Sequence, residues 1–181
     1  MSLLGKRYAS ALLSIADEKK VIDIYRQNLK NMVHYYENVP ELDIFIKNPQ
    51  INKEEKKRVL CEIMGKDTDE NFLNFIKVLV DKERMNAIAD ILENYEVLAN
   101  EKQNIVLIKV TSAMLLDDEQ IESIKQKYKK NFEGCKIEIK NVIDESIIGG
   151  IKLEVGDKIV DATLKTKLKS LKEHILSSEL K

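Results

Sequence analysis

The chain has few of the residues that usually carry metal or redox chemistry. Its 181 residues include two cysteines, Cys61 and Cys135, and two histidines, His34 and His174. The two cysteines are far from each other in the sequence, and so are the two histidines. Neither pair therefore has the close spacing of a zinc site or a redox couple. Free cysteines of this kind usually pack as small apolar side chains. We therefore expect no metal site and no bound cofactor.

Glycine is also scarce, and three of the six glycines lie in the stretch "SIIGGIKLEVGDKIVDATL", residues 146–164. A phosphate-binding loop needs the pattern G-x-x-x-x-G-K-[ST]. Gly150 and Gly156 have the wrong spacing for it, and Asp157 stands where the lysine is required. The dinucleotide pattern G-x-G-x-x-G is absent from the stretch. These departures exclude the usual nucleotide-binding motifs.

Long apolar runs and an excess of one charge are both missing. No run approaches the roughly 18 residues that a membrane-spanning helix needs. The first 20 residues lack the apolar centre of a secretory signal, and Asp17 and Glu18 fit a mitochondrial presequence poorly. With 30 basic and 31 acidic side chains, the chain lacks the basic excess typical of nucleic-acid binding. We expect an intracellular protein that neither inserts into a membrane nor binds nucleic acid.

Catalytic motifs are lacking as well. The chain has neither a G-x-S-x-G nucleophile elbow nor an H-E-x-x-H metal motif. Carboxylates are plentiful, but those on amphipathic helices are mostly solvated, and no pair is in an apolar sequence context that would raise a pKa. The sequence therefore gives no support to an enzyme and predicts no catalytic residue.

The first part of the chain has helical periodicity throughout. Apolar residues repeat at helical spacing over the segments 3–18, 21–38, 40–45, 53–64, 70–82 and 85–102. Pro40 and Pro49 interrupt the pattern, Asn52 with Glu55 forms a capping box, and Asp69 precedes another helix. This pattern predicts a six-helix bundle over 1–104.

The pattern changes after Asn104. A β-branched run at 105–113, a helix opened by Asp117, an alternating segment at 136–144 and a final helix from about Thr163 predict an α+β domain over 105–181. Gly156 suits a tight turn that joins two strands into a β-hairpin. In that hairpin Leu153 is opposite Val160, and Lys152 is opposite Asp161. We interpret Gly149-Gly150 as a bulge or a close backbone approach.

One apolar stripe of the first helix has two interpretations. Ala9, Ala11 and Ala16 lie among Tyr8 and larger apolar residues. Small residues let a second helix approach closely, which favours a protein-binding surface. The same stripe could equally pack the core of the bundle. Local charge is uneven too, with an acidic region at 67–101 and a final helix containing Lys165, Lys167, Lys169 and Lys172.

Several segments, in this order, resemble one family. They are "KRYASALLSIA" (6–16), "FIKNPQI" (45–51), "NFLNFIKVLVDKERMNAI" (71–88), "VTSAMLLDDEQ" (110–120) and "DESIIGGIKLEVGDKIVDATL" (144–164). Together they resemble the delta subunit of bacterial F-type ATP synthase, the counterpart of the mitochondrial oligomycin sensitivity-conferring protein. The most specific feature is V-T-S-A followed by the later I-G-G-x-x-L-x-x-G-D-x-x-x-D.

The resemblance implies a non-catalytic stator subunit at the cytoplasmic face of the bacterial inner membrane. In the family, the first domain binds the amino-terminal helix of an alpha subunit of the catalytic head, and the second binds the b subunits of the peripheral stalk. The alpha helix occupies a groove between the first and fifth helices. The matching positions here are Tyr8, Ala11, Leu12, Ile15, Phe72, Ile76, Leu79 and Val80. The positions of the carboxy-terminal motif, expected to be structural, are Gly149, Gly150, Gly156, Asp157 and Asp161.

An alternative from another class is a small helical RNA-binding or transcription-factor module. It would need a basic patch with interleaved aromatic residues. The net charge of −1 and the acidic region at 67–101 argue against it.

Overall fold

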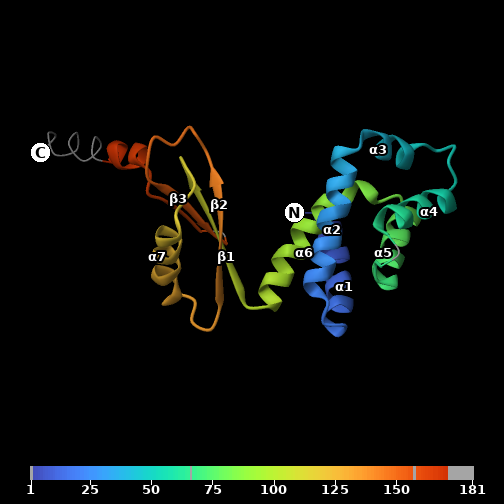
Figure 1. The fold of residues 1–181 in the computed structure, drawn as a ribbon, viewed down its shortest axis with the longest axis horizontal. Coiled ribbons are helices and arrows are strands. Elements are labelled where there is room, and N and C mark those ends of the chain that lie inside the picture. The colour runs from blue at the N-terminus through green and yellow to red at the C-terminus, as the bar shows by residue number, and fades with distance from the viewer. Residues whose placement is uncertain (1, 66, 157, 171–181) are drawn as a thin grey trace, which may run out of the picture. The chain divides into compact units, whose positions relative to one another are not determined.

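The computed structural model describes residues 2–65, 67–156 and 158–170 (Figure 1). Its internal contacts divide the chain into two units, Met1–Ala99 and Asn100–Lys181. The sequence placed the change of pattern slightly later, at 104/105. In the structure, strand β1 begins at Ile105, while the last residues of the preceding helix belong to the second unit.

The first unit is helical. Its elements are α1 (Leu3–Glu18), α2 (Ile22–Asn38), α3 (Pro40–Lys47), α4 (Lys53–Met64), α5 (Glu70–Asp81), the short 3₁₀ turn η1 (Met85–Ala87) and α6 (Ile88–Lys102).

The predicted helix boundaries follow from local capping. The Asn52 side chain accepts a hydrogen bond from the Glu55 backbone N–H at 2.8 Å, which satisfies a free donor of the first turn of α4. Asp69 caps α5 in the same way through the Asn71 N–H at 2.9 Å. Pro40 is the first residue of α3, and Gly65, with φ of +83°, ends α4. The helix starts predicted at Pro40, Asn52 and Asp69 are confirmed.

One apolar core holds the helices of the first unit together. Its largest fully buried side chains include Tyr25, Phe72 and Tyr95. Tyr25 and Phe72 pack edge to face with their ring centroids 5.4 Å apart. The buried Tyr95 hydroxyl donates to the Ile22 carbonyl at 3.0 Å, so this polar group is satisfied and joins α6 to α2.

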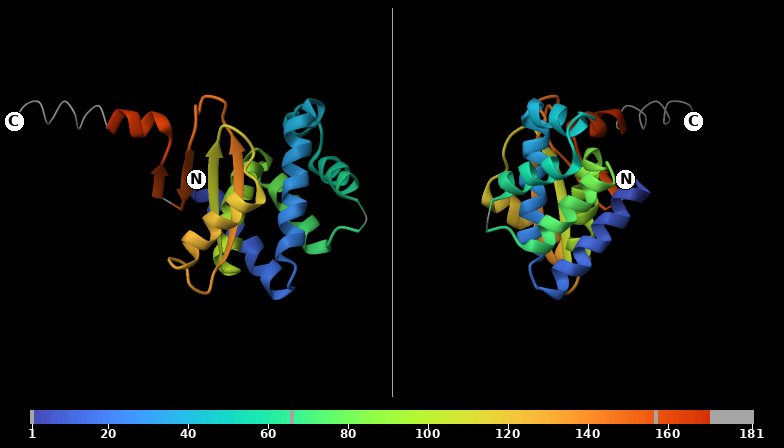
Figure 2. Two further views of the ribbon diagram at one scale, coloured as in Figure 1. Left: turned by 60° about the vertical axis from the view of Figure 1, so that its left-hand side comes forward. Right: turned by 90° about the vertical axis from the view of Figure 1, so that its right-hand side faces the viewer.

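The second unit is a four-stranded sheet with a helix on one face, as Figure 2 shows. Its elements are β1 (Ile105–Ser112), α7 (Asp118–Lys129), β2 (Lys136–Ile143), β3 (Ile151–Val155) and β4 (Lys158–Asp161). Residues 164–170 are also helical. The strand order is β2-β1-β3-β4: β1 pairs in parallel with β2 through the α7 crossover, and the other two pairs are antiparallel.

Strand register separates an apolar face from a polar one. Ile108, Val110 and Leu153 are buried on the same face, against Ile124 and Tyr128 of α7. The predicted hairpin register is confirmed, because the pairs 153↔160 and 152↔161 occur between β3 and β4. The helical first part and the α+β second part therefore agree with the predicted classes. In the described part of the chain, no helix is long and apolar enough to cross a membrane.

Candidate functional site

The first candidate surface lies where α1 and α5 run side by side in opposite directions. Lys19, just after α1, forms an ion pair of 2.8 Å with Asp69, which caps the start of α5. Nearer the other end, the Tyr8 and Phe75 rings meet edge to face with their centroids 6.2 Å apart. The Arg84 guanidinium then donates to the Tyr8 hydroxyl at 2.8 Å and lies over its ring. Contacts near both ends thus hold the two helices side by side, so that their exposed sides form one surface.

The structure separates the eight predicted head-binding residues by burial. Five of them belong to the core of the unit: Leu12, Phe72, Ile76 and Leu79 are fully buried and Val80 is 4% exposed. Tyr8 and Ile15 are half-buried, and Ala11 is exposed. Packing in the core is therefore confirmed for the buried residues of the set, including Leu12 of α1. Binding of a partner stays a prediction, and only the other three residues have atoms exposed for it.

The sequence prediction omitted one exposed apolar residue of α5. Val78 is 44% exposed and follows Asn71 and Phe75 at the spacing i, i+4, i+7, which places all three on one side of the helix. Phe75 contacts Tyr8, so this side of α5 borders α1. This i, i+4, i+7 spacing is present in the sequence. It was overlooked because the neighbouring stripe of Phe72, Ile76, Leu79 and Val80 is more strongly apolar. We define the α1/α5 surface as Tyr8, Ala11, Ile15 and Val78.

The Asp69 carboxylate forms the charged contact that holds the start of α5 beside the end of α1. It accepts from the Lys19 ammonium at 2.8 Å, from the Tyr25 hydroxyl at 2.5 Å and from the Asn71 N–H at 2.9 Å. The hydrogen bonds from Lys19 and Tyr25 lower the pKa of Asp69 to about 2. Burial and the neighbouring carboxylate in turn raise the pKa of the Tyr25 hydroxyl, so it remains a donor. One side chain therefore links the α1–α2 connection to the start of α5.

Acid should weaken the first unit through Asp69. The folded-state pKa of about 2 is below the value near 4 of an unfolded aspartate, so this carboxylate stabilises the fold above about pH 4. That contribution is lost as the pH falls from about 4 to about 2. When the free energy of unfolding is measured against pH, we expect Asp69→Asn to reduce its slope between about pH 2 and pH 4. Tyr25→Phe, which removes one donor, should reduce the slope partly, whereas an unchanged slope in both variants would contradict the assignment.

The glycine pair in the second unit makes room for the start of the last helical segment. A Cβ on Gly150 would come within 2.5 Å of the Ala162 carbonyl oxygen and 2.9 Å of the Thr163 Cα. Gly150 also has φ of +83°, which favours glycine. The Gly149 carbonyl accepts from the Leu164 N–H at 2.9 Å. Of the two structural roles considered for the pair, the contacts identify the close backbone approach.

Asp161 holds the turn that leads into the same segment, and Thr163 caps it. Its carboxylate accepts from the Thr163 N–H at 2.9 Å and from the Thr166 hydroxyl at 2.8 Å, and the first of these lowers the pKa of Asp161. The Thr163 hydroxyl accepts from the Thr166 N–H at 3.4 Å. Gly156, with φ of +56°, lies in the turn between β3 and β4, whereas the predicted Asp157 lies outside the described residues. Gly149, Gly150 and Asp161 thus position one helix start, for structural rather than chemical reasons.

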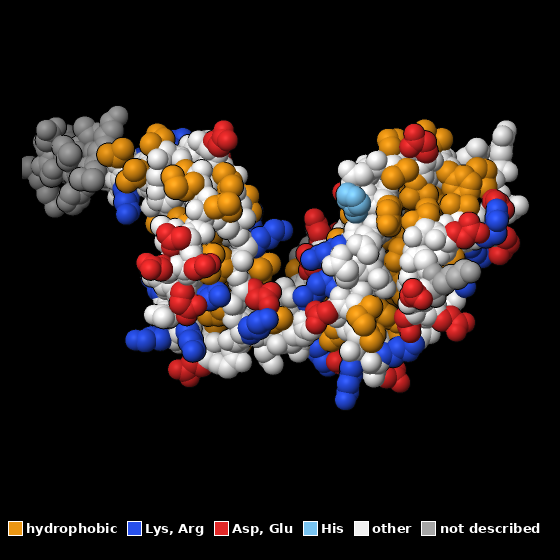
Figure 3. Space-filling model, in the orientation of Figure 1, with side chains coloured by type: hydrophobic (Ala, Val, Ile, Leu, Met, Phe, Trp, Pro, Cys, Tyr) orange, Lys and Arg blue, Asp and Glu red, His pale blue; other side chains and the backbone are white. Residues whose placement is uncertain are grey.

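A second apolar surface is found at the end of the sheet where β1 and β2 finish. Its members are exposed apolar side chains. We call it the sheet-end surface and define it as Met114 (73% exposed), Leu115 (72%), Ile143 (50%), Ile148 (85%), Leu164 (47%) and Leu168 (66%). Figure 3 shows hydrophobic side chains gathered at this end of the unit, over the loop at 144–150 and the segment at 164–170.

Asn141 fixes the loop that displays part of the sheet-end surface. Its amide donates to the Val110 carbonyl at 3.0 Å and to the Ser112 hydroxyl at 2.8 Å, and its carbonyl accepts from the Leu116 N–H at 2.9 Å. The Ser112 hydroxyl donates to the Met114 carbonyl at 2.7 Å. Sequence reasoning did not identify Asn141, because nothing local indicates that β2 lies beside β1. The exposed loop is thus held by partly buried polar contacts.

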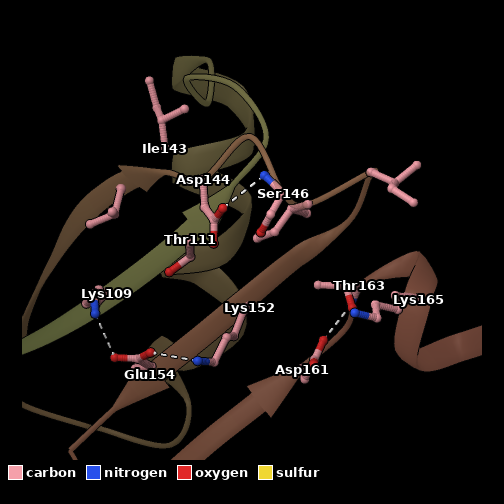
Figure 4. A pocket seen from close by; sticks show the side chains of 13 residues that line it. Lys109, Thr111, Ile143, Asp144, Ser146, Lys152, Glu154, Asp161, Thr163 and Lys165 are labelled. Carbon is pink, nitrogen blue, oxygen red and sulfur yellow. Dashed lines mark hydrogen bonds and ion pairs between the residues drawn. The ribbon is translucent and has the colours of Figure 1, made fainter.

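The polar face of the sheet holds a cavity of about 480 Å³ (Figure 4). Lys109 and Lys152 each form an ion pair of 3.1 Å with Glu154. Lys152 also lies opposite Asp161 in the register. Positive and negative groups therefore alternate, which does not favour an ion of either sign. Across residues 2–65, 67–156 and 158–170, no group of three or more histidine, cysteine or acidic side chains is placed to hold a metal.

The described residues thus present an exposed apolar surface on each unit and no metal-binding group, an arrangement typical of proteins that bind other proteins. Residues 4–175 match the family described as ATP synthase delta (OSCP) subunit. The chain is 39% identical to ATP synthase subunit delta of Acetivibrio thermocellus over 176 residues, which is 97% of this chain and 99% of that protein. It is 36% identical to the subunit delta of Bacillus thuringiensis strain Al Hakam, covering 97% of each.

Similarity to a solved structure is consistent with this fold. A chain of the Toxoplasma gondii mitochondrial ATP synthase hexamer superimposes with a TM-score of 0.73 at 18% identity, over 97% of this chain and 98% of that one. The protein belongs to the ATP synthase delta (OSCP) subunit family. It is a stator component of the peripheral stalk of F-type ATP synthase, and catalysis belongs to other subunits. The RNA-binding alternative finds no support.

Proposed function

We propose that this chain ties the b subunits of the peripheral stalk to the amino-terminal helix of an alpha subunit of the catalytic head. The link operates at the cytoplasmic face of the bacterial inner membrane and keeps the head from turning with the rotor. The observation that carries the proposal is that each unit of this family member presents an exposed apolar surface, the α1/α5 surface on the first and the sheet-end surface on the second. We assign the first unit, with helices α1–α6 acting as one bundle, to the head and the second unit to the stalk.

The α1/α5 surface suits an amphipathic helix. Ala11 is exposed and small, so a partner backbone can come close, while Tyr8 and Ile15 provide apolar edges on either side along α1. Val78 of α5 is the facing apolar wall. Below them, the fully buried Leu12 and Phe72 keep the spacing of the two helices. The expected partner contacts are therefore those of a helix lying in a shallow groove.

The sheet-end surface suits the stalk. Its most exposed apolar residue, Ile148, is 85% accessible, and a patch of such residues favours protein binding over solvation. Lys165 and Lys167 in the neighbouring helical segment are exposed and would attract acidic groups beside an apolar stripe. The final lysine of the predicted basic set, Lys172, lies outside the described residues.

The work of such a link is mechanical. No bond is made or broken; the link must bind tightly at both ends and deform little under torque. The dense core of the first unit and the hydrogen-bonded loop at Asn141 provide that stiffness, because close-packed interiors have low compressibility.

Single charges on the two surfaces should separate the two functions. Ala11→Glu should weaken binding of an alpha-subunit amino-terminal peptide at least tenfold, because it places a charge in an apolar contact. Ile148→Glu should weaken binding of a b-subunit carboxy-terminal segment to a similar extent. Each variant should leave the other interaction unchanged. Calorimetric titration of the purified chain with each segment measures both effects.

A matched control is available on α1. Ser10 is exposed, next to Ala11, and about 100° around the helix. Ser10→Glu adds the same charge to the same helix and should leave alpha-peptide binding within about twofold of the unchanged protein. The proposal is wrong if neither segment binds, or if Ser10→Glu and Ala11→Glu reduce alpha-peptide binding equally.

A further inference from the structure

The first unit contains a second cleft, away from the α1/α5 surface. It has a volume of about 490 Å³ and lies between the ends of α2 and α3, the connection into α4, and the α5–η1 turn. Its apolar wall consists of Tyr36, Ile46, Pro49, Ile51, Val80 and Met85. In Figure 3, hydrophobic side chains gather over the end of α3 and the connection into α4. The volume is within the range that accommodates bulky side chains of a ligand.

The rim of the cleft is positively charged. Among the described residues, Lys47, Lys53 and Lys56 line it together with one acid, Glu83. Lys53 pairs with Glu83 at 3.0 Å, and Lys47 pairs with Asp43 at 2.7 Å. Among the described residues, Lys56 forms no ion pair within 4.0 Å, although its charge helps to lower the pKa of Glu83. One lysine therefore remains available to an incoming carboxylate.

The cleft and the α1/α5 surface are on different sides of α5. Val80 lines the cleft and Val78 belongs to the α1/α5 surface, and two positions on a helix are about 160° apart around its axis. The same unit can therefore hold one segment in each place without overlap. Nothing in the proposed link to the alpha-subunit helix accounts for this second cleft.

We infer that the cleft binds a second protein segment, an acidic one that inserts a bulky apolar side chain. The apolar wall favours a leucine- or phenylalanine-sized group, and the lysines at the rim favour flanking aspartate or glutamate. Nucleic acid fits less well, because the described lining residues include an acid beside the three lysines and offer one aromatic ring for stacking, that of Tyr36. A basic segment would be repelled. This second attachment goes beyond the link proposed above.

Site-specific photo-cross-linking in the assembled ATP synthase tests the inference. A benzophenone amino acid replaces Ile51, inside the cleft, and in a matched sample it replaces Ile44, which is 67% exposed on α3 and does not line the cleft. Mass spectrometry then identifies the attached peptide. We expect the Ile51 position alone to give a protein adduct, within a segment in which acidic residues outnumber basic ones next to a leucine, isoleucine or phenylalanine.

Charge variants make the test specific. Lys56→Glu should lower the adduct yield at least fivefold, and the milder Lys56→Gln should lower it about twofold. Lys6→Glu, on the exposed side of α1, should leave it unchanged. Ala11→Glu should also leave the yield unchanged per copy of the chain retained in the complex, which separates this inference from the α1/α5 proposal. The inference is overturned if Ile51 gives no more adduct than Ile44, if the adduct is with lipid, nucleic acid or a basic segment, or if Ala11→Glu abolishes it.

Discussion

Gly150→Ala should destabilise the second unit by about 3 kcal/mol. A left-handed backbone costs a residue with a Cβ roughly 1–2 kcal/mol, and an overpacked contact costs about 1–3 kcal/mol more. Both apply at Gly150, where φ is +83° and the added Cβ would be 2.5 Å from the Ala162 carbonyl oxygen. That oxygen belongs to the backbone, so it cannot move aside as the end of a flexible side chain would.

Gly156→Ala is the matched control for this prediction. Gly156 also has a positive φ, of +56°, but a Cβ there would meet nothing within 4 Å. Only the cost of the left-handed backbone applies there, so we expect Gly156→Ala to lower the free energy of unfolding of the second unit by about 1 kcal/mol. Hydrogen exchange of β1 and β3 amides in the full chain gives the opening free energy of the second unit separately from that of the first. Equal losses in the two variants would show that the close approach to Ala162 contributes nothing.

Leu79→Ala should cost the first unit about 3 kcal/mol. Leu79 is fully buried in the core, and truncating such a leucine removes apolar contacts and leaves a cavity, with typical losses of roughly 2–5 kcal/mol. Val78→Ala, one position earlier, removes a side chain that is 44% exposed and should change the free energy of unfolding by no more than about 0.5 kcal/mol. Urea unfolding followed by far-ultraviolet circular dichroism measures both.

The contrast between these neighbours also decides how binding should be tested. A charge at Leu79 would unfold the unit, so loss of partner binding in that variant would say nothing about the α1/α5 surface. Ala11, which is exposed, gives a usable test. If Leu79→Ala and Val78→Ala had equal effects on stability, the assignment of Leu79 to the core would be wrong.

Local sequence was sufficient for the helices of the first unit. Asn52, Asp69 and the prolines act within a few residues of their own positions, so the segments they delimit were predictable without knowledge of the fold. The hairpin register was predictable for the same reason, because a tight turn at Gly156 fixes which residues of β3 and β4 are opposite each other. The family was predictable too, because the order of residues in the V-T-S-A and I-G-G stretches is a property of the chain itself and does not depend on how distant segments pack.

Tertiary structure alone decided which predicted site residues are accessible. Ala11 and Leu12 belong to the same apolar stripe, yet one is exposed and the other fully buried, because α5 and the core cover only part of the stripe. The sequence could not place β1 between β2 and β3 either, since pairing between distant strands depends on the whole sheet. The contacts of Asn141 and the lysines around the second cleft arise from the same long-range packing. Short-range chemistry therefore specified the elements and the family, and packing between distant segments specified the surfaces.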